Sequence, residues 1–176
     1  MKRNIPGFKT ILQNVALTGH KDANYELGLI SEKELEKDKG RPHTLYQIEL
    51  INKAIKKYAI AAIQGHFEAK SALERLTESE WEKAQDFLES YRATHKSYDI
   101  FCALKKFKNA AMGGNTEALN ILKELAEKDS IIINKENKEI AKKELDEVTT
   151  FKEMLKNFDK KAPEQSVIAG ADAGVD

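Results

Sequence analysis

Histidine is the residue type in this chain whose spacing most invites a chemical interpretation. The chain has four histidines, and two of them, His20 and His66, each directly follow a glycine. No histidine has a second histidine or cysteine at the helical spacing that a metal site on one helix would use. Asn115 follows a glycine in the same way, and either side chain can accept a hydrogen bond from a backbone N–H at a helix start. We therefore expect structural histidines and no metal site.

Other residues that could carry chemistry lack the required pattern. Carboxylates are numerous but are mixed with lysines, as in residues 32–34 and 136–147, which is typical of a solvated helix face. The single cysteine, Cys102, lies in an apolar segment and is expected in the core. Gly113-Gly114 lies between two helical patterns and predicts a turn, not a phosphate loop. The sequence thus predicts no catalytic residues and no cofactor.

The composition disfavours several classes of partner. Acidic and basic residues balance at 29 each, so no general electrostatic attraction to nucleic acid or an anionic membrane is expected. The apolar residues near the N-terminus are interrupted by Lys9, Gln13 and Asn14, unlike the core of a signal peptide. No apolar run is long enough to span a bilayer. We therefore expect a cytoplasmic or otherwise soluble protein with no nucleic-acid partner and no membrane span.

The sequence contains an internal repeat, and this repeat must position the histidines and glycines described above. Residues 58–76 match residues 107–125 at a constant spacing of 49 (107 − 58), and a shorter stretch upstream matches at a spacing of 46 (65 − 19). The matching positions are mostly small or apolar, as expected where helices pack closely. They are Ala61 with Ala110, Ala62 with Ala111, Gly19 with Gly65 and Gly114, Ala23 with Ala69 and Ala118, and Leu27 with Leu73 and Leu122. Repeats of this kind are typical of stacked helical hairpins.

Apolar residues recurring every three or four positions predict the individual helices. Two segments, Ser31 to Glu34 and Thr77 to Glu80, have the composition of a capping box, so each predicts a new helix start. The segments 32–43 and 78–97 are then inserts between helices, and Ile131 to Ile133 is a buried linker. We expect helices near residues 8–16, 20–30, 45–62, 69–76, 81–91, 98–111, 118–125 and 136–159, and a further short helix that begins at Ser31.

These elements predict an all-α fold. We expect a short α-solenoid of helical hairpins over residues 1–160, with repeat boundaries near 19, 65 and 114. The last helix has lysines and glutamates on one side and would act as a C-terminal capping helix. Residues 161–176 are rich in small residues and are expected to be a disordered tail.

Two stretches share a more specific pattern: an alanine, an aromatic residue four positions later, an Ala-Ala pair and a glycine. The matching residues are Ala54, Tyr58, Ala61, Ala62 and Gly65 in one stretch and Ala103, Phe107, Ala110, Ala111 and Gly114 in the other. This pattern resembles the Sel-one-like repeat, a subclass of the tetratricopeptide-type α/α repeats. The Leu27-Gly28 pair also resembles the first helix of that family. The resemblance implies a scaffolding protein, often bacterial, and includes proteins that act on host partners.

Stacked hairpins leave extended surfaces that suit the binding of a protein or peptide better than a closed reaction pocket. We therefore expect a non-enzymatic adaptor or scaffold. The resemblance implies that the first helix of each unit lines a concave binding surface. Its residues would be Tyr25, Leu29, Ser71, Arg75, Asn120 and Glu124.

Two alternatives to the adaptor remain open. The first is a structural subunit that self-associates through an exposed apolar face, such as that of the final helix. The second is an enzyme whose site is built from the inserts, which a deep pocket lined by carboxylates or by His43 and His95 would favour.

Overall fold

The computed structural model describes residues 7–38, 40, 44–127 and 133–160, and all regular secondary structure in these ranges is helical. The all-α prediction is therefore confirmed. The helices are α1 (Phe8–Leu17), α2 (Lys21–Lys37), α3 (Leu45–Ile63), α4 (Phe67–Thr94), α5 (Ser97–Met112), α6 (Thr116–Glu127) and α7 (Lys135–Asp159).

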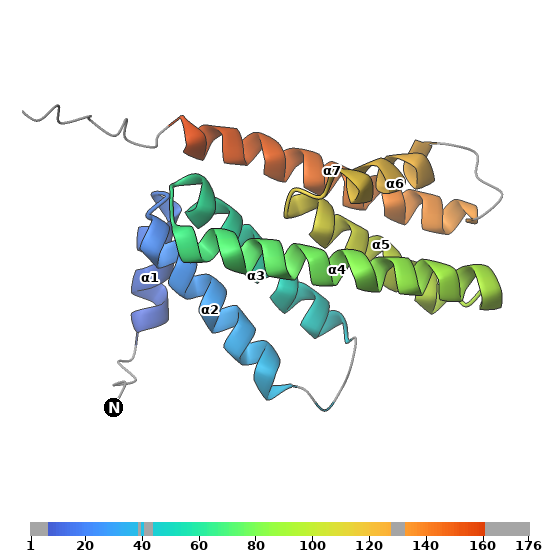
Figure 1. Cartoon of the computed structure of the whole chain (residues 1–176), viewed down its shortest axis with the longest axis horizontal. Helices are drawn as coiled ribbons and strands as arrows, with labels where there is room; N and C mark the ends of the chain where they lie inside the picture. The colour runs from blue at the N-terminus through green and yellow to red at the C-terminus, as the bar shows by residue number, and fades with distance from the viewer. Residues whose placement is uncertain (1–6, 39, 41–43, 128–132, 161–176) are drawn as a thin grey trace, which may run out of the picture.

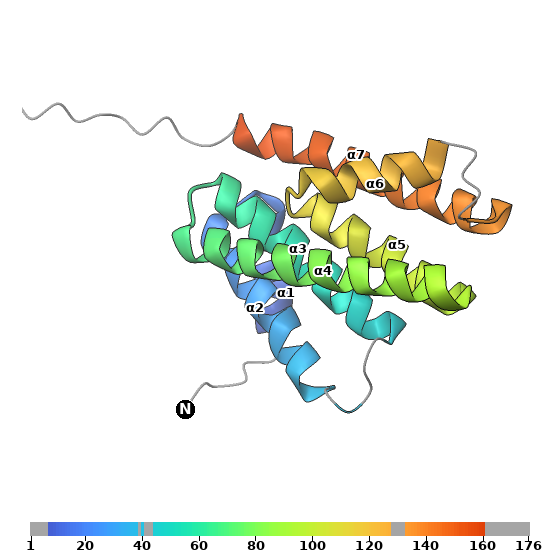
Figure 2. The same cartoon turned by 45° about the vertical axis from the view of Figure 1, so that its right-hand side comes forward.

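Each helix packs against the next one along the chain, and α3, α5 and α7 also contact one another. α6 and α7 lie side by side along one edge of the molecule, with α1 and α2 towards the opposite edge (Figure 1, Figure 2). Helices α3, α5 and α7 therefore meet as one group. Their contacts bring together residues that are far apart in the sequence.

The repeat positions end their helices in the same way. Gly19, Gly65 and Gly114 all have positive φ angles, of 88°, 81° and 108°, which a glycine adopts without a steric penalty. The following residue then caps the next helix. Nδ1 of His20 and of His66 and Oδ1 of Asn115 accept hydrogen bonds from the backbone N–H groups of Ala23, Ala69 and Ala118. The predicted structural role of these side chains is confirmed.

The predicted capping boxes are wrong. Ser31 lies inside α2 and Thr77 inside α4, and their hydroxyls donate to the carbonyl oxygens of Leu27 and Leu73, one turn earlier. The same side chains can cap a helix start or bond back within a helix. Here the helix continues because buried residues such as Leu88 extend the apolar face of α4 beyond Thr77.

The expected inserts are consequently helical for much of their length. Residues 32–37 extend α2 and residues 78–94 extend α4. His95 ends α4 in a left-handed conformation, with φ 55°, and its ring meets the edge of Tyr91. His43, part of Ile131 to Ile133 and the tail 161–176 lie outside the described residues, although Ile133 itself is buried.

The core is built from the faces that the periodicity predicted. In α3 and α5 it includes Ile55, Tyr58, Leu104 and Phe107, all fully buried. Cys102 is also buried, and burial raises the pKa of its thiol, as expected for a core residue and not for a nucleophile. Among the described residues no helix is long and apolar enough to cross a bilayer.

Candidate functional site: a lysine-lined groove

Two adjoining hollows, of about 390 and 440 Å³, lie where α3, α5 and α7 meet. They share the side chains of Lys56, Lys143 and Glu147, so we treat them as one feature, the lysine groove. The first hollow is lined by Leu45, Ile48, Glu49, Asn52, Lys53, Lys56, Lys105, Lys108, Lys143 and Glu147. The second is lined by Lys56, Lys143, Asp146, Glu147, Thr150, Phe151 and Met154.

Helical spacing explains why these side chains face the groove. On α3, Asn52 and Lys53 lie three and four residues after Glu49, and Lys56 lies four and three residues after them, so the four side chains form a single stripe. The neighbouring positions Ile48, Ile51 and Ile55 are buried and hold that stripe against the core. Lys105 and Lys108 of α5 and Lys143 and Glu147 of α7 have the same spacing. Packing of three amphipathic helices thus brings five lysines to one hollow.

Two of these lysines are already neutralised. Lys105 and Lys108 both pair with Glu144 of α7, whose side chain is completely buried, and Lys108 Nζ lies 2.6 Å from Glu144 Oε2. Lys108 also contacts Glu147 at 2.9 Å. Burial alone would lower the pKa of Lys108, but hydrogen bonds and charges from Glu144 and Glu147 outweigh burial and raise that pKa. These pairs join α5 to α7 at the base of the groove.

The other three lysines are not held by carboxylates. In the described part of the chain, no ion pair or hydrogen bond engages Lys53 or Lys143, and both are exposed. Lys56 is half-buried, with its Nζ 6.0 Å from the centre of the Phe151 ring. Burial lowers the pKa of Lys56, although the nearby Glu147 opposes that shift. Among the described residues the groove therefore presents three lysines outside any ion pair, beside the carboxylates of Glu49 and Asp146.

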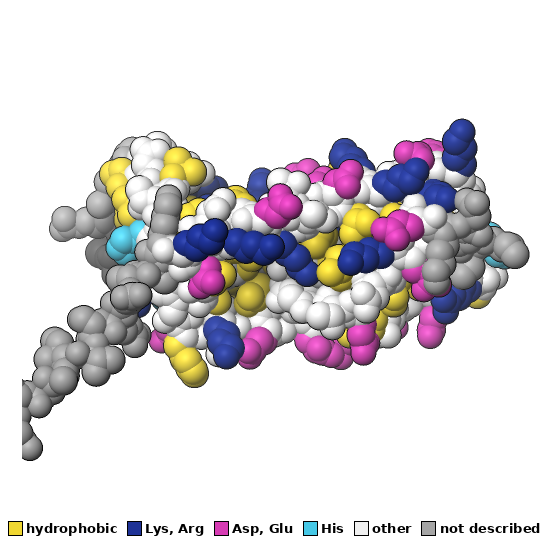
Figure 3. Space-filling view, turned by 90° about the horizontal axis from the view of Figure 1, so that it is seen from above, with side chains coloured by type: hydrophobic (Ala, Val, Ile, Leu, Met, Phe, Trp, Pro, Cys, Tyr) yellow, Lys and Arg dark blue, Asp and Glu magenta, His cyan; other side chains and the backbone are white. Residues whose placement is uncertain are grey.

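The α7 side of the groove is more apolar. Phe151 is buried beneath the second hollow, and Met154 is 38% exposed beside it. Leu45, which lines the first hollow, is 55% exposed. Figure 3, seen from the α7 side, shows charges of both signs with apolar side chains visible between them. This side of the molecule therefore has acidic, basic and apolar side chains together, and not charges of a single sign.

A buried polar network supports the groove from behind. Glu80 of α4 accepts hydrogen bonds from Lys106 Nζ at 3.2 Å and from Asn109 Nδ2 at 2.9 Å. Asn109 Oδ1 in turn accepts from Asn52 Nδ2 of α3 at 2.9 Å. This chain of contacts links α4, α5 and α3, and so fixes the positions of the helices that carry the groove lysines.

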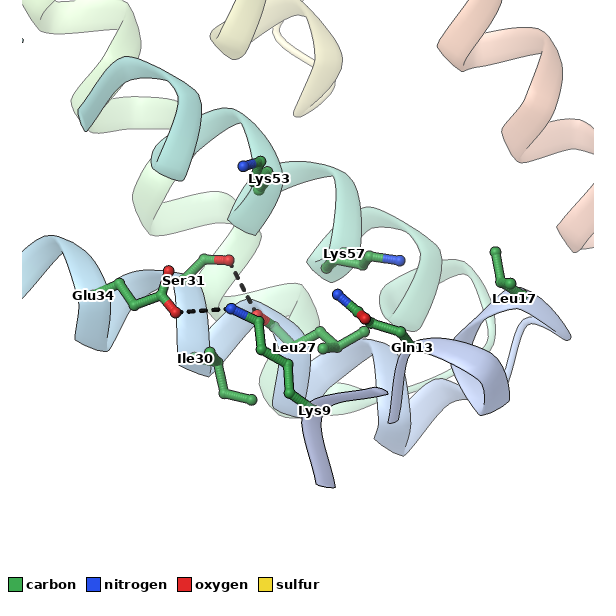
Figure 4. A pocket seen from close by; sticks show the side chains of 9 residues that line it. All are labelled: Lys9, Gln13, Leu17, Leu27, Ile30, Ser31, Glu34, Lys53 and Lys57. Carbon is green, nitrogen blue, oxygen red and sulfur yellow. Dashed lines mark hydrogen bonds and ion pairs between the residues drawn. The ribbon is translucent and has the colours of Figure 1, made fainter. Parts of the chain in front are cut away.

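A separate hollow of about 370 Å³ lies between α1, α2 and α3, and Figure 4 shows its lining side chains. Two of its three lysines have partners: Lys9 pairs with Glu34 at 2.9 Å, and Lys57 donates to Asn24 Oδ1 at 3.3 Å. The third, Lys53, also lines the lysine groove. Because two of its three lysines already have hydrogen-bond partners within the molecule, this hollow is a weaker candidate for binding.

The six predicted partner-binding residues lie on α2, α4 and α6, and none of them lines the lysine groove. Some are engaged within the molecule. Tyr25 stacks on His66 with ring centres 4.2 Å apart, Leu29 packs against the core, and Arg75 contacts both carboxylate oxygens of Glu32. Ser71, Asn120 and Glu124 are exposed.

Sequence reasoning missed the groove, although one signal was present. Lys56 and Lys105 occupy equivalent repeat positions, 49 residues apart (105 − 56), and both line the groove. Lys143, Glu144 and Glu147 fall in a segment that appeared only as a mixed-charge helix face. Their proximity to Lys105 and Lys108 depends on how α7 packs, which no local pattern encodes.

Comparison with known proteins found no matching family model, no matching curated protein and no matching solved structure.

Proposed function

We propose that this chain is a non-enzymatic protein–protein interaction module, an adaptor or scaffold, that binds a segment of a partner protein in the lysine groove. In this proposal α2–α3, α4–α5 and α6–α7 are stacked hairpins of a Sel-one-like solenoid, and α7 is its cap. Contacts among α3, α5 and α7, the second helices of the three hairpins, support the stacked arrangement. The repeated glycine and cap positions support it independently.

The observation that carries the proposal is an open groove with exposed lysines that form no ion pair within the described part of the chain. Lys53 and Lys143 are exposed at opposite walls, on α3 and α7, and neither has a carboxylate partner among the described residues. A groove of this kind offers contacts along its length to an extended or helical protein segment. The surface expected on α2, α4 and α6 offers less, because Arg75 is already paired with Glu32.

Self-association remains a second candidate, through a different helix from the one expected. Val148 and Phe151 of the final helix are buried against the rest of the molecule. Of its large apolar side chains Met154 is exposed, whereas α1 has several that are exposed, including Phe8 (50%) and Ile11 (59%). Sedimentation measured over a range of concentrations tests this alternative directly, since a dimer formed through α1 would dissociate on dilution and on Ile11→Asp substitution.

Selection of binders from a random peptide library displayed on phage tests the adaptor proposal. The immobilised chain should enrich peptides that no longer bind the variant Lys53→Glu/Lys143→Glu. The matched control is Lys33→Glu/Lys70→Glu, which makes the same charge change at exposed positions of α2 and α4 outside the groove. Peptides that bind both variants equally would place recognition elsewhere, and no enrichment would reject the adaptor proposal.

A further inference from the structure

We infer that the occupant of the lysine groove is an acidic amphipathic helix, with carboxylates facing the lysines and apolar side chains facing Leu45, Phe151 and Met154. This inference rests on the proposed function and specifies the chemistry of the partner. It follows from the charge, the apolar surface and the length of the groove.

The charged side chains of the groove indicate whether the partner segment is acidic or basic. Five lysines line the groove, and the carboxylates within reach of Lys105 and Lys108 are Glu144 and Glu147. Glu49 also lines the first hollow, so five lysines there face three carboxylates and the charge that remains for an incoming ligand is positive. A basic segment would be repelled by these lysines. Carboxylates placed between α3 and α7 would instead form ion pairs with them in a partly dehydrated site.

Apolar surface decides between a protein segment and a polyanion. A nucleic acid or polyphosphate is anionic along its whole length, so it would also bring negative charge to the second hollow, where Asp146 and Glu147 already offset Lys56 and Lys143. A polyanion would also make no apolar contact with Met154 and Phe151. A protein segment that alternates carboxylates with leucine-like side chains matches both features of the groove.

Length favours a helix. The groove follows α3 from Leu45 to Lys56 and α7 from Lys143 to Met154, which at 1.5 Å per residue is about 16 Å on each wall. Lys56 lies against Phe151, and Gln64 further along α3 donates to the carbonyl oxygen of Phe158, so the two walls run in the same direction. Two parallel walls of three turns each accommodate a third helix of similar length.

A designed peptide provides the test. The probe is a fluorescein-labelled helical peptide of about three turns, with glutamates on one face and leucines on the adjacent face. Its binding to the full chain is measured by fluorescence anisotropy. The variant Lys53→Glu/Lys143→Glu should weaken binding about tenfold, since two favourable pairs become two repulsive ones. Lys33→Glu/Lys70→Glu should leave binding unchanged. Circular dichroism checks that each variant is folded.

Changes in the probe separate the two parts of the inference. Replacing its glutamates by glutamine, or its leucines by serine, should each weaken binding about tenfold. Equal binding of the glutamine peptide would overturn the acidic partner, and equal binding of the serine peptide would overturn the amphipathic one. Displacement of the probe by oligothymidine at the same charge concentration would indicate a general anion site and also overturn the inference.

Failure of this inference differs from failure of the proposed function. If the designed peptide does not bind while the library yields groove-dependent peptides of another composition, the adaptor proposal stands and the acidic helix is rejected. If the library yields no groove-dependent peptide either, both are rejected.

Discussion

The ammonium group of Lys106 lies 3.2 Å from the carboxylate of Glu80 inside the core, where both side chains are almost inaccessible to solvent (2% and 1%). Taking two charges out of water is costly, and the pair is tolerated because each charge compensates the other. Asn109 donates a second hydrogen bond to Glu80 at 2.9 Å. The pair therefore makes the packing of α4 on α5 sensitive to loss of either partner.

We expect Lys106→Met to lower the free energy of unfolding by about 3 kcal/mol, because it leaves the buried Glu80 carboxylate without its cation. Lys105→Met is the matched control on the same helix, since its partner Glu144 keeps Lys108. Urea unfolding of both variants gives the comparison. Equal losses of unfolding free energy in the two variants would mean that the buried pair of Lys106 with Glu80 stabilises the fold no more than the interaction of Lys105. Adding Glu80→Gln to Lys106→Met should recover part of the loss.

A second prediction concerns the contact of Gly28 with Tyr58. A Cβ atom on Gly28 would collide with the Tyr58 ring, which is fully buried and cannot move aside. Overpacking of this kind costs about 1–3 kcal/mol, against roughly 1 kcal/mol that alanine gains over glycine in a helix. We therefore expect Gly28→Ala to lower the melting temperature. Gly40→Ala, where a Cβ meets nothing within 4 Å, should leave it unchanged.

The hydroxyl of Tyr58 supports a third prediction. It is buried without a hydrogen-bond partner among the described residues, and burial raises the pKa of Tyr58. Tyr58→Phe removes this unsatisfied group with little change of shape, so we expect unfolding to cost about 1 kcal/mol more than in the parent chain. Chemical denaturation at neutral pH measures the difference. Destabilisation by Tyr58→Phe would show that the hydroxyl is satisfied in solution.

A fourth prediction follows from the opposite pKa shifts of Lys56 and Lys108. Burial lowers the pKa of Lys56. At neutral pH the folded state therefore holds the charged ammonium group of Lys56 partly out of water. As pH rises through the lowered pKa towards the ordinary value of about 10.4, the folded state releases this proton first. The Lys56 contribution to stability therefore increases with pH over that window.

Lys56→Met should consequently stabilise the fold slightly at neutral pH and reduce this alkaline gain. Lys108→Met should destabilise it, because Lys108 is paired with Glu144 and Glu147 and their interactions raise its pKa. Unfolding by urea at neutral and at alkaline pH distinguishes the two variants. The same sign of change at neutral pH for both would contradict the conclusion that burial of Lys56 outweighs the attraction of Glu147.

Local patterns in the sequence were sufficient for the turns at Gly65 and Gly114 and for the positions of most helices, although not for the lengths of α2 and α4. A left-handed residue at a helix end favours glycine, and the next helix start favours a side chain that accepts a hydrogen bond. Gly65-His66 and Gly114-Asn115 therefore identify their turns without tertiary information. Apolar periodicity located the core faces for the same reason, since a helix buries residues three and four apart.

Tertiary structure alone decided the choices that depend on distant partners. Ser31 and Thr77 can cap a helix or bond back within one, and the continued apolar face selected the second. Among 29 basic and 29 acidic residues, composition cannot tell which lysine is buried against Glu80 and which faces an open groove. Lys53, Lys105 and Lys143 become neighbours only because α3, α5 and α7 pack together, and that packing is set by long-range burial, not by local spacing.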